Sequence, residues 1–101
     1  MTAELEGMRP RRKEGLFIRQ AKGENAVYDP KTGQVHLLNT TAWAIWDLCD
    51  GETHPEEMID AICEISRMHR DLVSEDVQRV LGDFDKAGLL DWVAATQVQL
   101  P

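Results

Sequence analysis

Apolar and β-branched residues dominate three short segments in the first part of the chain: Leu16–Gln20, Ala26–Tyr28 and Gln34–Leu38. Segments of this length and composition, bounded by turn-forming residues, are typical of β-strands. The first two are separated by Ala21–Glu24, and the last two by Asp29–Gly33, which has proline in second place and glycine at its end. Proline presets φ and glycine accepts a positive φ, so this connection favours a tight hairpin turn. The pattern predicts a three-stranded antiparallel meander, in which at least one outer strand has an open edge.

Beyond the third segment the apolar positions recur at helical spacing. Asn39, Thr40 or Thr41 can cap a first helix, which is predicted to end at Asp50–Gly51. A second helix is predicted to begin at Thr53–Glu56, because this stretch has the sequence of a capping box with an early proline. The apolar stripe of this second helix consists of Met58, Ile59, Ile62, Cys63, Ile65 and Met68.

A third helix is predicted to begin at Ser74, whose hydroxyl can cap it. Glu75 and Asp76 then interact favourably with the positive end of the helix dipole. The core-facing positions of this helix are Val77, Val80, Leu81 and Phe84. Gly88 suits the position just after a helix, where a left-handed conformation is common, and Leu89–Val93 is predicted to fold back as a short extended segment.

The predicted order of elements is βββααα, which indicates a winged-helix-like α+β fold: a three-stranded antiparallel sheet followed by three helices. A chain of 101 residues has room for one core and therefore for one domain, which we place at residues 16–93. Residues 1–15 show no periodicity and are predicted to be a flexible N-terminal tail. Residues 94–101 are predicted to be a frayed C-terminal tail. Within the domain, Trp46 of the first predicted helix is expected to lie in the core.

The net charge of −7 argues against a nucleic-acid partner. Arg9, Arg11, Arg12 and Lys13 gather near the N-terminus, which leaves the rest of the chain more acidic than the whole. Proteins that bind duplex DNA need clustered cations against the phosphates, so no nucleic-acid partner is expected. No apolar run approaches the roughly 20 residues of a membrane span, and Met1–Gly15 lacks the apolar centre of a signal peptide. A cytoplasmic protein with no membrane partner is therefore predicted.

Side chains capable of chemistry are few. Cys49 and Cys63 fall on the apolar sides of helical patterns and are interpreted as buried, reduced thiols. Together with His36, His54 and His69 they show none of the spacings of a zinc site, so no metal ligand and no cofactor is predicted. The sequence also lacks a nucleophile beside a base and a glycine-rich phosphate loop, and no catalytic residue is predicted. These features favour a binding module over an enzyme.

Several short motifs follow one another along the chain. They are Tyr28-Asp29-Pro30, Gly33, Leu37-Leu38-Asn39-Thr40-Thr41-Ala42, Ile45-Trp46 and Leu48-Cys49-Asp50-Gly51, followed by Val77, Leu81, Phe84 and Ala87-Gly88-Leu89-Leu90. In this order and spacing they resemble the signature of the PqqD-like family over about residues 16–93. The junction Leu38–Ala42 differs from the usual form in the member that serves pyrroloquinoline quinone synthesis. It is similar to the broader family, including stand-alone lasso-peptide proteins.

The resemblance implies a RiPP recognition element, a domain that binds precursor peptides of ribosomally synthesised and post-translationally modified peptides. In this family the leader of the precursor adds as a strand to the third strand of the meander and lies between that strand and the third helix. Carried over to this chain, the peptide-binding residues are Gln34, Val35, His36, Leu37 and Leu38 on the strand and Asp76, Val77, Arg79, Val80, Asp83 and Phe84 on the helix. The chain would be a non-enzymatic peptide chaperone for a tailoring enzyme, such as a radical SAM enzyme, a leader peptidase or a cyclase.

Alternatives remain open from the residues themselves. Gln34–Leu38 contains neither proline nor charge, as an edge that accepts a strand requires, but a shielded central strand has the same composition. His36 fits an ordinary strand surface residue or a hydrogen-bond partner of the peptide. The helical layout also fits a winged-helix DNA-binding regulator, against which stands the acidic excess of residues 74–87. A scaffold subunit that binds only its enzyme partner is a further alternative, and an open edge predicts a monomer or a weak homodimer.

Overall fold

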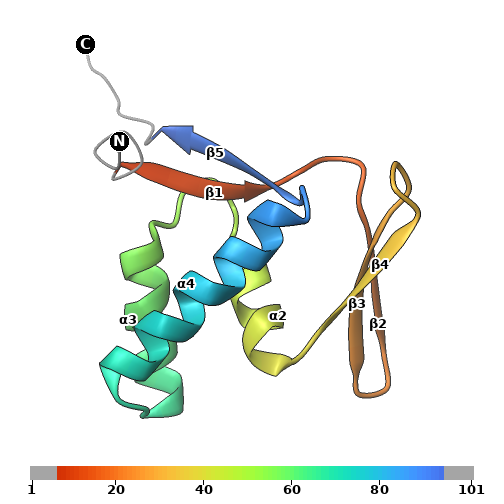
Figure 1. Cartoon of the computed structure of the whole chain (residues 1–101). Helices are drawn as coiled ribbons and strands as arrows, with labels where there is room; N and C mark the ends of the chain where they lie inside the picture. The colour runs from red at the N-terminus through yellow and green to blue at the C-terminus, as the bar shows by residue number, and fades with distance from the viewer. Residues whose placement is uncertain (1–6, 95–101) are drawn as a thin grey trace.

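A computed structural model describes residues 7–94; residues 1–6 and 95–101, which hold part of the predicted N-terminal tail and nearly all of the C-terminal one, lie outside the described residues. The elements are β1 Met8–Arg12, β2 Phe17–Ala21, β3 Glu24–Asp29, β4 Gln34–Leu38, α2 Thr40–Asp47, α3 Pro55–Ser66, α4 Arg70–Lys86 and β5 Leu90–Ala94. The strands form two antiparallel sheets, β1–β5 and β2–β3–β4. In Figure 1 the helices gather on one side, the β2–β3–β4 sheet extends from α2, and the β1–β5 ribbon runs across one end of the helices.

The three-stranded sheet has the connections that the sequence predicts. Its register pairs Val27 of β3 with Ile18 of β2 on one side and with His36 of β4 on the other. A hydrogen bond of 2.7 Å from the Gly33 N–H to the Asp29 carbonyl closes the hairpin between β3 and β4, with Gly33 at φ 76°. The predicted α+β fold of three strands followed by three helices is confirmed. β4 lies at an edge of the sheet, so the alternative of a central strand is wrong.

The ribbon of β1 and β5 corrects the prediction for the N-terminal segment. Met8–Arg12 pairs with Leu90–Ala94, and Pro10, which lies opposite Trp92, is fully buried. The prediction of a flexible tail over residues 1–15 is therefore wrong for Met8–Arg12. Its residues are mostly charged and its partner lies at the other end of the chain, so no local pattern indicated the pairing.

Arg12 attaches β1 to the helices. Its backbone N–H donates to the Cys49 carbonyl at 3.0 Å. Its guanidinium donates through Nη1 to the carbonyls of Trp46 at 2.8 Å and Asp47 at 3.0 Å. Carbonyls in the last turn of a helix have no partner within the helix and form its negative end. The Arg12 cation therefore caps the end of α2.

Two helices begin at histidines and not at the hydroxyl residues that the sequence favoured. α3 is capped by His54 in place of Thr53, and Glu57 completes the capping box. α4 begins after His69, about one turn before the predicted cap at Ser74. In both helices the imidazole Nδ1 accepts a backbone N–H of the first turn. An imidazole nitrogen thus takes the role for which a hydroxyl or carboxylate is usual.

The core lies mainly among the three helices, and it is completed by Val27 and Leu38 from the three-stranded sheet and by Pro10 and Leu90 from the β1–β5 ribbon. Its most enclosed side chains include Val27, Ile45, Trp46, Cys49, Met58, Val73, Val77, Phe84 and Leu89. The predicted core residues of the third helix and the buried Trp46 are confirmed. Ile65 and Met68, which the sequence assigns to the apolar stripe of the second helix, are exposed and do not join the core. Ile65 lies in the last turn of α3 and Met68 beyond it, after Arg67 has turned the chain with a positive φ of 61°.

Candidate functional site

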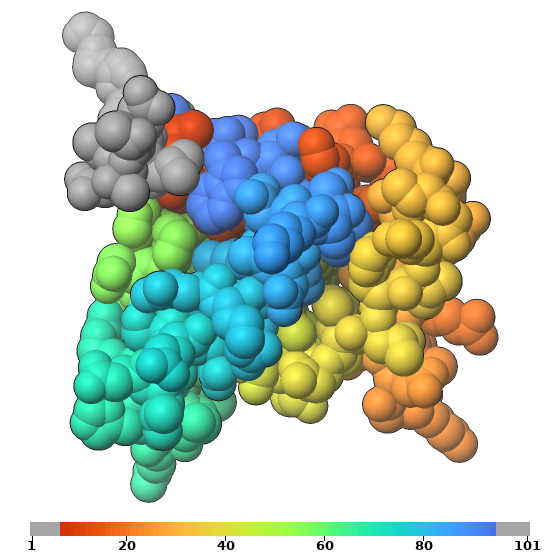
Figure 2. All heavy atoms as spheres, in the orientation of Figure 1, coloured from red at the N-terminus to blue at the C-terminus, as the bar shows by residue number. Residues whose placement is uncertain are grey.

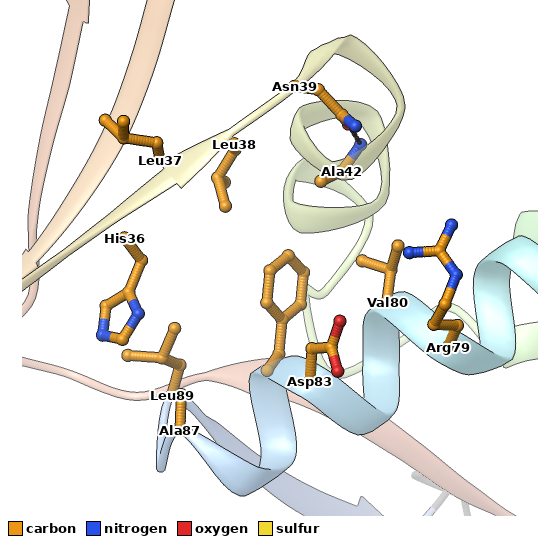
Figure 3. A pocket seen from close by; sticks show the side chains of 11 residues that line it. His36, Leu37, Leu38, Asn39, Ala42, Arg79, Val80, Asp83, Ala87 and Leu89 are labelled. Atoms are coloured by element: carbon orange, nitrogen blue, oxygen red, sulfur yellow. Dashed lines mark hydrogen bonds between the residues drawn. The ribbon is translucent and has the colours of Figure 1, made fainter.

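A groove of about 240 Å³ lies between β4 and α4. Figure 2 shows α4 in blue beside the yellow segment that contains β4 and the start of α2. The strand side contributes His36, Leu37, Leu38, Asn39 and Ala42, and the helix side contributes Arg79, Val80, Asp83, Phe84, Ala87 and Leu89. The side chains converge from the two sides in Figure 3. The groove therefore has one wall from a sheet edge and one from a helix.

Most of the predicted site residues line this groove. They are His36, Leu37 and Leu38 on β4 and Arg79, Val80, Asp83 and Phe84 on α4. Gln34 and Val35 are exposed on β4 outside the groove. Asp76 is paired with Arg79 and does not line the groove. Val77 shares the apolar stripe of α4 with Val80 and Phe84, but it is fully buried in the core and does not line the groove.

Four lining residues were not predicted: Asn39, Ala42, Ala87 and Leu89. Ala87 could have been predicted from helical spacing, because it lies four residues after Asp83 and hence on the same face of the helix. Leu89 enters the lining because Gly88, at φ 76°, reverses the chain at the end of α4. Of the three candidate caps Asn39, Thr40 and Thr41, Asn39 caps α2, and its Oδ1 accepts the Ala42 N–H at 2.8 Å. That bond fixes the junction of β4 and α2.

The floor of the groove is apolar and its rim is charged. Leu38, Val80 and Phe84 are buried members of the core that also line the groove. Arg79 and Asp83 are exposed at the rim. The Arg79 Nη2 donates to the Asp76 Oδ1 at 2.9 Å, so this cation is already paired. The arrangement suits a segment that places apolar side chains on the floor and polar ones at the rim.

His36 is set into the strand wall with one ring nitrogen enclosed. Its Nε2 is buried and has no hydrogen-bond partner among the described residues. The side chain shares the inner face of β4 with Leu38, since residues two apart on a strand point the same way. A buried nitrogen without a partner lowers stability. His36 is thus a half-buried part of the groove and differs from an ordinary strand surface residue.

The free edge of β4 is apolar and uncharged. Val35 and Leu37 expose 58% and 69% of their surface. Every second residue of an antiparallel edge strand directs its backbone N–H and C=O away from its neighbour. Because the hairpin closes at the pair Asp29–Gln34, we expect Val35 and Leu37 to be those residues. The opposite edge, β2, carries Arg19, and a charge of this kind discourages strand pairing.

Metal-ligating side chains do not gather in the part of the chain that the structure describes. Within residues 7–94, no three His, Cys, Asp or Glu side chains are placed to hold a metal ion. Burial raises the pKa of Cys49 to about 12, and its Sγ donates to the Ile45 carbonyl at 3.3 Å, so the thiol stays protonated. Cys63, predicted to be buried, is only partly so. In the same residues no helix combines the length and the apolar character of a membrane span.

Residues 24–90, more than half of the chain, match the family described as Coenzyme PQQ synthesis protein D (PqqD). The chain belongs to the PqqD family. The match runs from the start of β3 to the first residue of β5, so it includes both walls of the groove. The family resemblance drawn from the sequence motifs is confirmed.

Two solved structures share the fold of this PqqD-family chain. One is TbiB1 in complex with the TbiA(beta) leader peptide: it has a TM-score of 0.71 at 22% identity and covers 88% of this chain and 99% of its own. The other is lasso peptide synthetase B1 complexed with the leader peptide: it has a TM-score of 0.70 at 18% identity and covers 81% of this chain and 96% of its own. No curated protein matches the chain.

Proposed function

We propose that this PqqD-family protein binds the leader of a ribosomally made precursor peptide by β-strand addition to β4. The observation that carries the proposal is the open, uncharged edge of β4 beside a groove whose second wall is α4. The leader forms a fourth strand on the outward backbone groups of Val35 and Leu37, and its alternate side chains enter the groove. Backbone hydrogen bonds supply affinity, and the groove supplies selectivity.

The two structures that share the fold support this proposal, because each of those proteins is in complex with a leader peptide. The family match adds support, since it includes β4 and α4 together. The open edge of β4 and the groove beside it favour the same class of ligand, an extended peptide. An exposed edge with a neighbouring groove of alternating pockets is what strand addition requires.

The protein acts as a non-enzymatic chaperone that presents the precursor to a separate tailoring enzyme, such as a radical SAM enzyme or a leader peptidase. β4 has 5 residues, so the added strand engages only a short stretch of the leader. The rest of the precursor stays outside the groove and is free to reach an active site. The protein is proposed to work as a monomer or a weak homodimer.

A winged-helix DNA-binding role has less support from the charges on α4. Between residues 74 and 87 the acidic side chains are Glu75, Asp76, Asp83 and Asp85, and the basic ones are Arg79 and Lys86. Arg79 is moreover paired with Asp76. A helix of this charge repels the phosphates that flank a major groove.

Calorimetric titration with synthetic leader peptides tests the proposal. The probes are the N-terminal halves of the short reading frames encoded beside the gene for this chain, added to the full chain. At least one is expected to bind with a Kd below about 100 μM. Val35→Pro removes an outward N–H and is expected to abolish binding, whereas Val35→Thr keeps the N–H and the β-branched shape and is expected to bind.

Circular dichroism establishes that both variants are folded before they are compared. If no probe binds, or if Val35→Pro binds as tightly as the unchanged protein, strand addition to β4 is wrong. Co-purification with a neighbouring enzyme in the absence of any leader affinity would instead favour the scaffold alternative.

A further inference from the structure

Asp83, on the helix wall of the groove, is an acidic residue whose side chain has no partner among the described residues. The acidic side chains near it on α4 are both engaged. Asp76 accepts from Arg79 at 2.9 Å, and Asp85 accepts the Trp92 Nε1–H at 3.0 Å. Asp83 is thus the unpaired negative charge that faces the groove.

The position of Asp83 in α4 adds to this imbalance. The helix ends at Lys86, so Asp83 lies in its last turn, where the helix dipole disfavours a negative charge. Arg79 is four residues earlier and within reach of an i,i+4 pair, but it pairs with Asp76. In Figure 3 the side chain of Val80 lies between the Arg79 guanidinium and the Asp83 carboxylate. No described residue neutralises the Asp83 carboxylate.

A peptide seated in the groove would cover Asp83 together with apolar neighbours. Val80, Phe84 and Ala87 line the same side of the groove. Removing water from a carboxylate that has no partner is costly, and a cation that donates hydrogen bonds to it offsets this cost. A ligand without a cation at this place therefore leaves an uncompensated charge, whereas a ligand with one gains a charge-assisted hydrogen bond.

We propose that Asp83 selects leader peptides that place a Lys or Arg on the inner face of the added strand, two residues from an apolar side chain that fills the floor. The inference rests on the proposed function and names its ligand chemistry. Residues two apart on a strand share a face, as His36 and Leu38 do on β4, so both side chains enter the groove from one side of the peptide. The net charge of −7 on the chain also favours the approach of a basic segment.

Selection from a displayed library of random peptides about twelve residues long, enough to span the β4 edge, tests the inference. The immobilised targets are the full chain, Asp83→Asn, Asp83→Lys and the matched control Glu75→Gln. Glu75 is exposed on the same helix but does not line the groove, so its variant removes an equal charge at another place. The unchanged chain and Glu75→Gln are expected to enrich Lys or Arg two positions from an apolar residue. Asp83→Asn loses this preference, and Asp83→Lys replaces it with Asp or Glu.

The affinity of one peptide, taken from those selected on the unchanged chain, supplies a second measurement. This peptide is expected to bind Asp83→Asn roughly tenfold more weakly than the unchanged chain and with a smaller dependence on salt. Glu75→Gln is expected to bind it with unchanged affinity.

Two further results separate this inference from the proposed function. If the pool is lost with Val35→Pro but contains no basic preference, or does not change with Asp83→Lys, the role of Asp83 is wrong and strand addition stands. If Val35→Pro selects the same pool as the unchanged chain, strand addition itself is wrong and the inference fails with it.

Discussion

The rings of Trp46 and Phe84 meet edge to face, with centroids 5.2 Å apart and planes at 80°. Trp46 belongs to α2 and Phe84 to α4, so this contact holds the two helices together beneath the groove. Phe84 also lines the groove. The shape of the binding floor and the packing of the core therefore depend on the same ring.

Phe84→Leu is expected to lower the free energy of unfolding by about 1–2 kcal/mol, because it removes the edge-to-face contact and part of the buried ring volume. Urea denaturation followed by tryptophan fluorescence measures the change. Phe17→Leu is the matched control: Phe17 is 61% exposed, and its replacement is expected to cost no more than about 0.5 kcal/mol. Equal losses in the two variants would show that the Trp46 contact does not matter.

Arg12→Met is expected to destabilise the protein by about 1–2 kcal/mol. The carbonyls at the end of α2 lose their hydrogen-bond donor, and the negative end of the helix dipole loses the cation that stabilises it. Methionine keeps most of the aliphatic stem. Arg11→Met serves as the control, since Arg11 contributes only an exposed ion pair with Asp91 at 3.8 Å. The capping role of Arg12 would be refuted by equal urea midpoints for the two variants.

Local signals explain which parts of the fold could be predicted from the sequence. β4 was predicted with its observed bounds because both ends are marked, by Gly33 before it and by the helix cap Asn39 after it. The strand Met8–Arg12 could not be found in this way. It has a charged composition with a proline, and its stability depends on Leu90–Ala94 at the other end of the chain. The start of α4 was missed because histidine is an unusual cap.

The candidate site follows the same division. The edge residues His36 to Leu38 follow from the strand pattern and the family resemblance, and they line the groove. On α4 helical spacing predicts the apolar stripe, but it does not tell which members border the groove: Val80 and Phe84 do, whereas Val77 is enclosed in the core. Asp83 is unpaired because Arg79 pairs with Asp76, three residues before it, and not with Asp83, four residues after it. Helical spacing allows both pairs, so the sequence does not tell which one forms.

The two cysteines are expected to differ in reactivity. Cys49 is fully buried with its pKa raised to about 12, whereas Cys63 is partly exposed. At pH 8 a thiol reagent is expected to label Cys63 in the folded protein and Cys49 at least about a hundredfold more slowly. Addition of guanidinium chloride should make both react. Rapid labelling of Cys49 in the folded state would contradict the burial of this thiol.

Asp50 is expected to make stability depend on pH in the acid range. Partial burial raises its pKa, but hydrogen bonds from the backbone N–H groups of Glu52 and Thr53 and from the Thr53 hydroxyl outweigh this and hold the pKa below 3.8. A lowered pKa in the folded state contributes stability above the unfolded pKa, and this contribution is lost as the pH falls through the folded value.

Asp50→Ala is therefore expected to be less stable than the unchanged chain at pH 7, with a difference that shrinks as the pH falls below 3.8. Urea midpoints measured across this range give the comparison. A difference that stays constant from pH 7 to the acid end would contradict the proposed role of the ionised carboxylate.

Amide hydrogen exchange, measured by NMR with and without a binding leader peptide, tests strand addition to β4 most directly. If the leader adds to β4, the N–H groups of Val35 and Leu37 are expected to exchange freely in the unbound protein and to become strongly protected in the complex, because they form hydrogen bonds with the added strand. The amides of the β2 edge, Phe17–Ala21, should keep their exchange rates. Protection that appears on β2, or a complex in which Val35 and Leu37 still exchange freely, would contradict strand addition to β4.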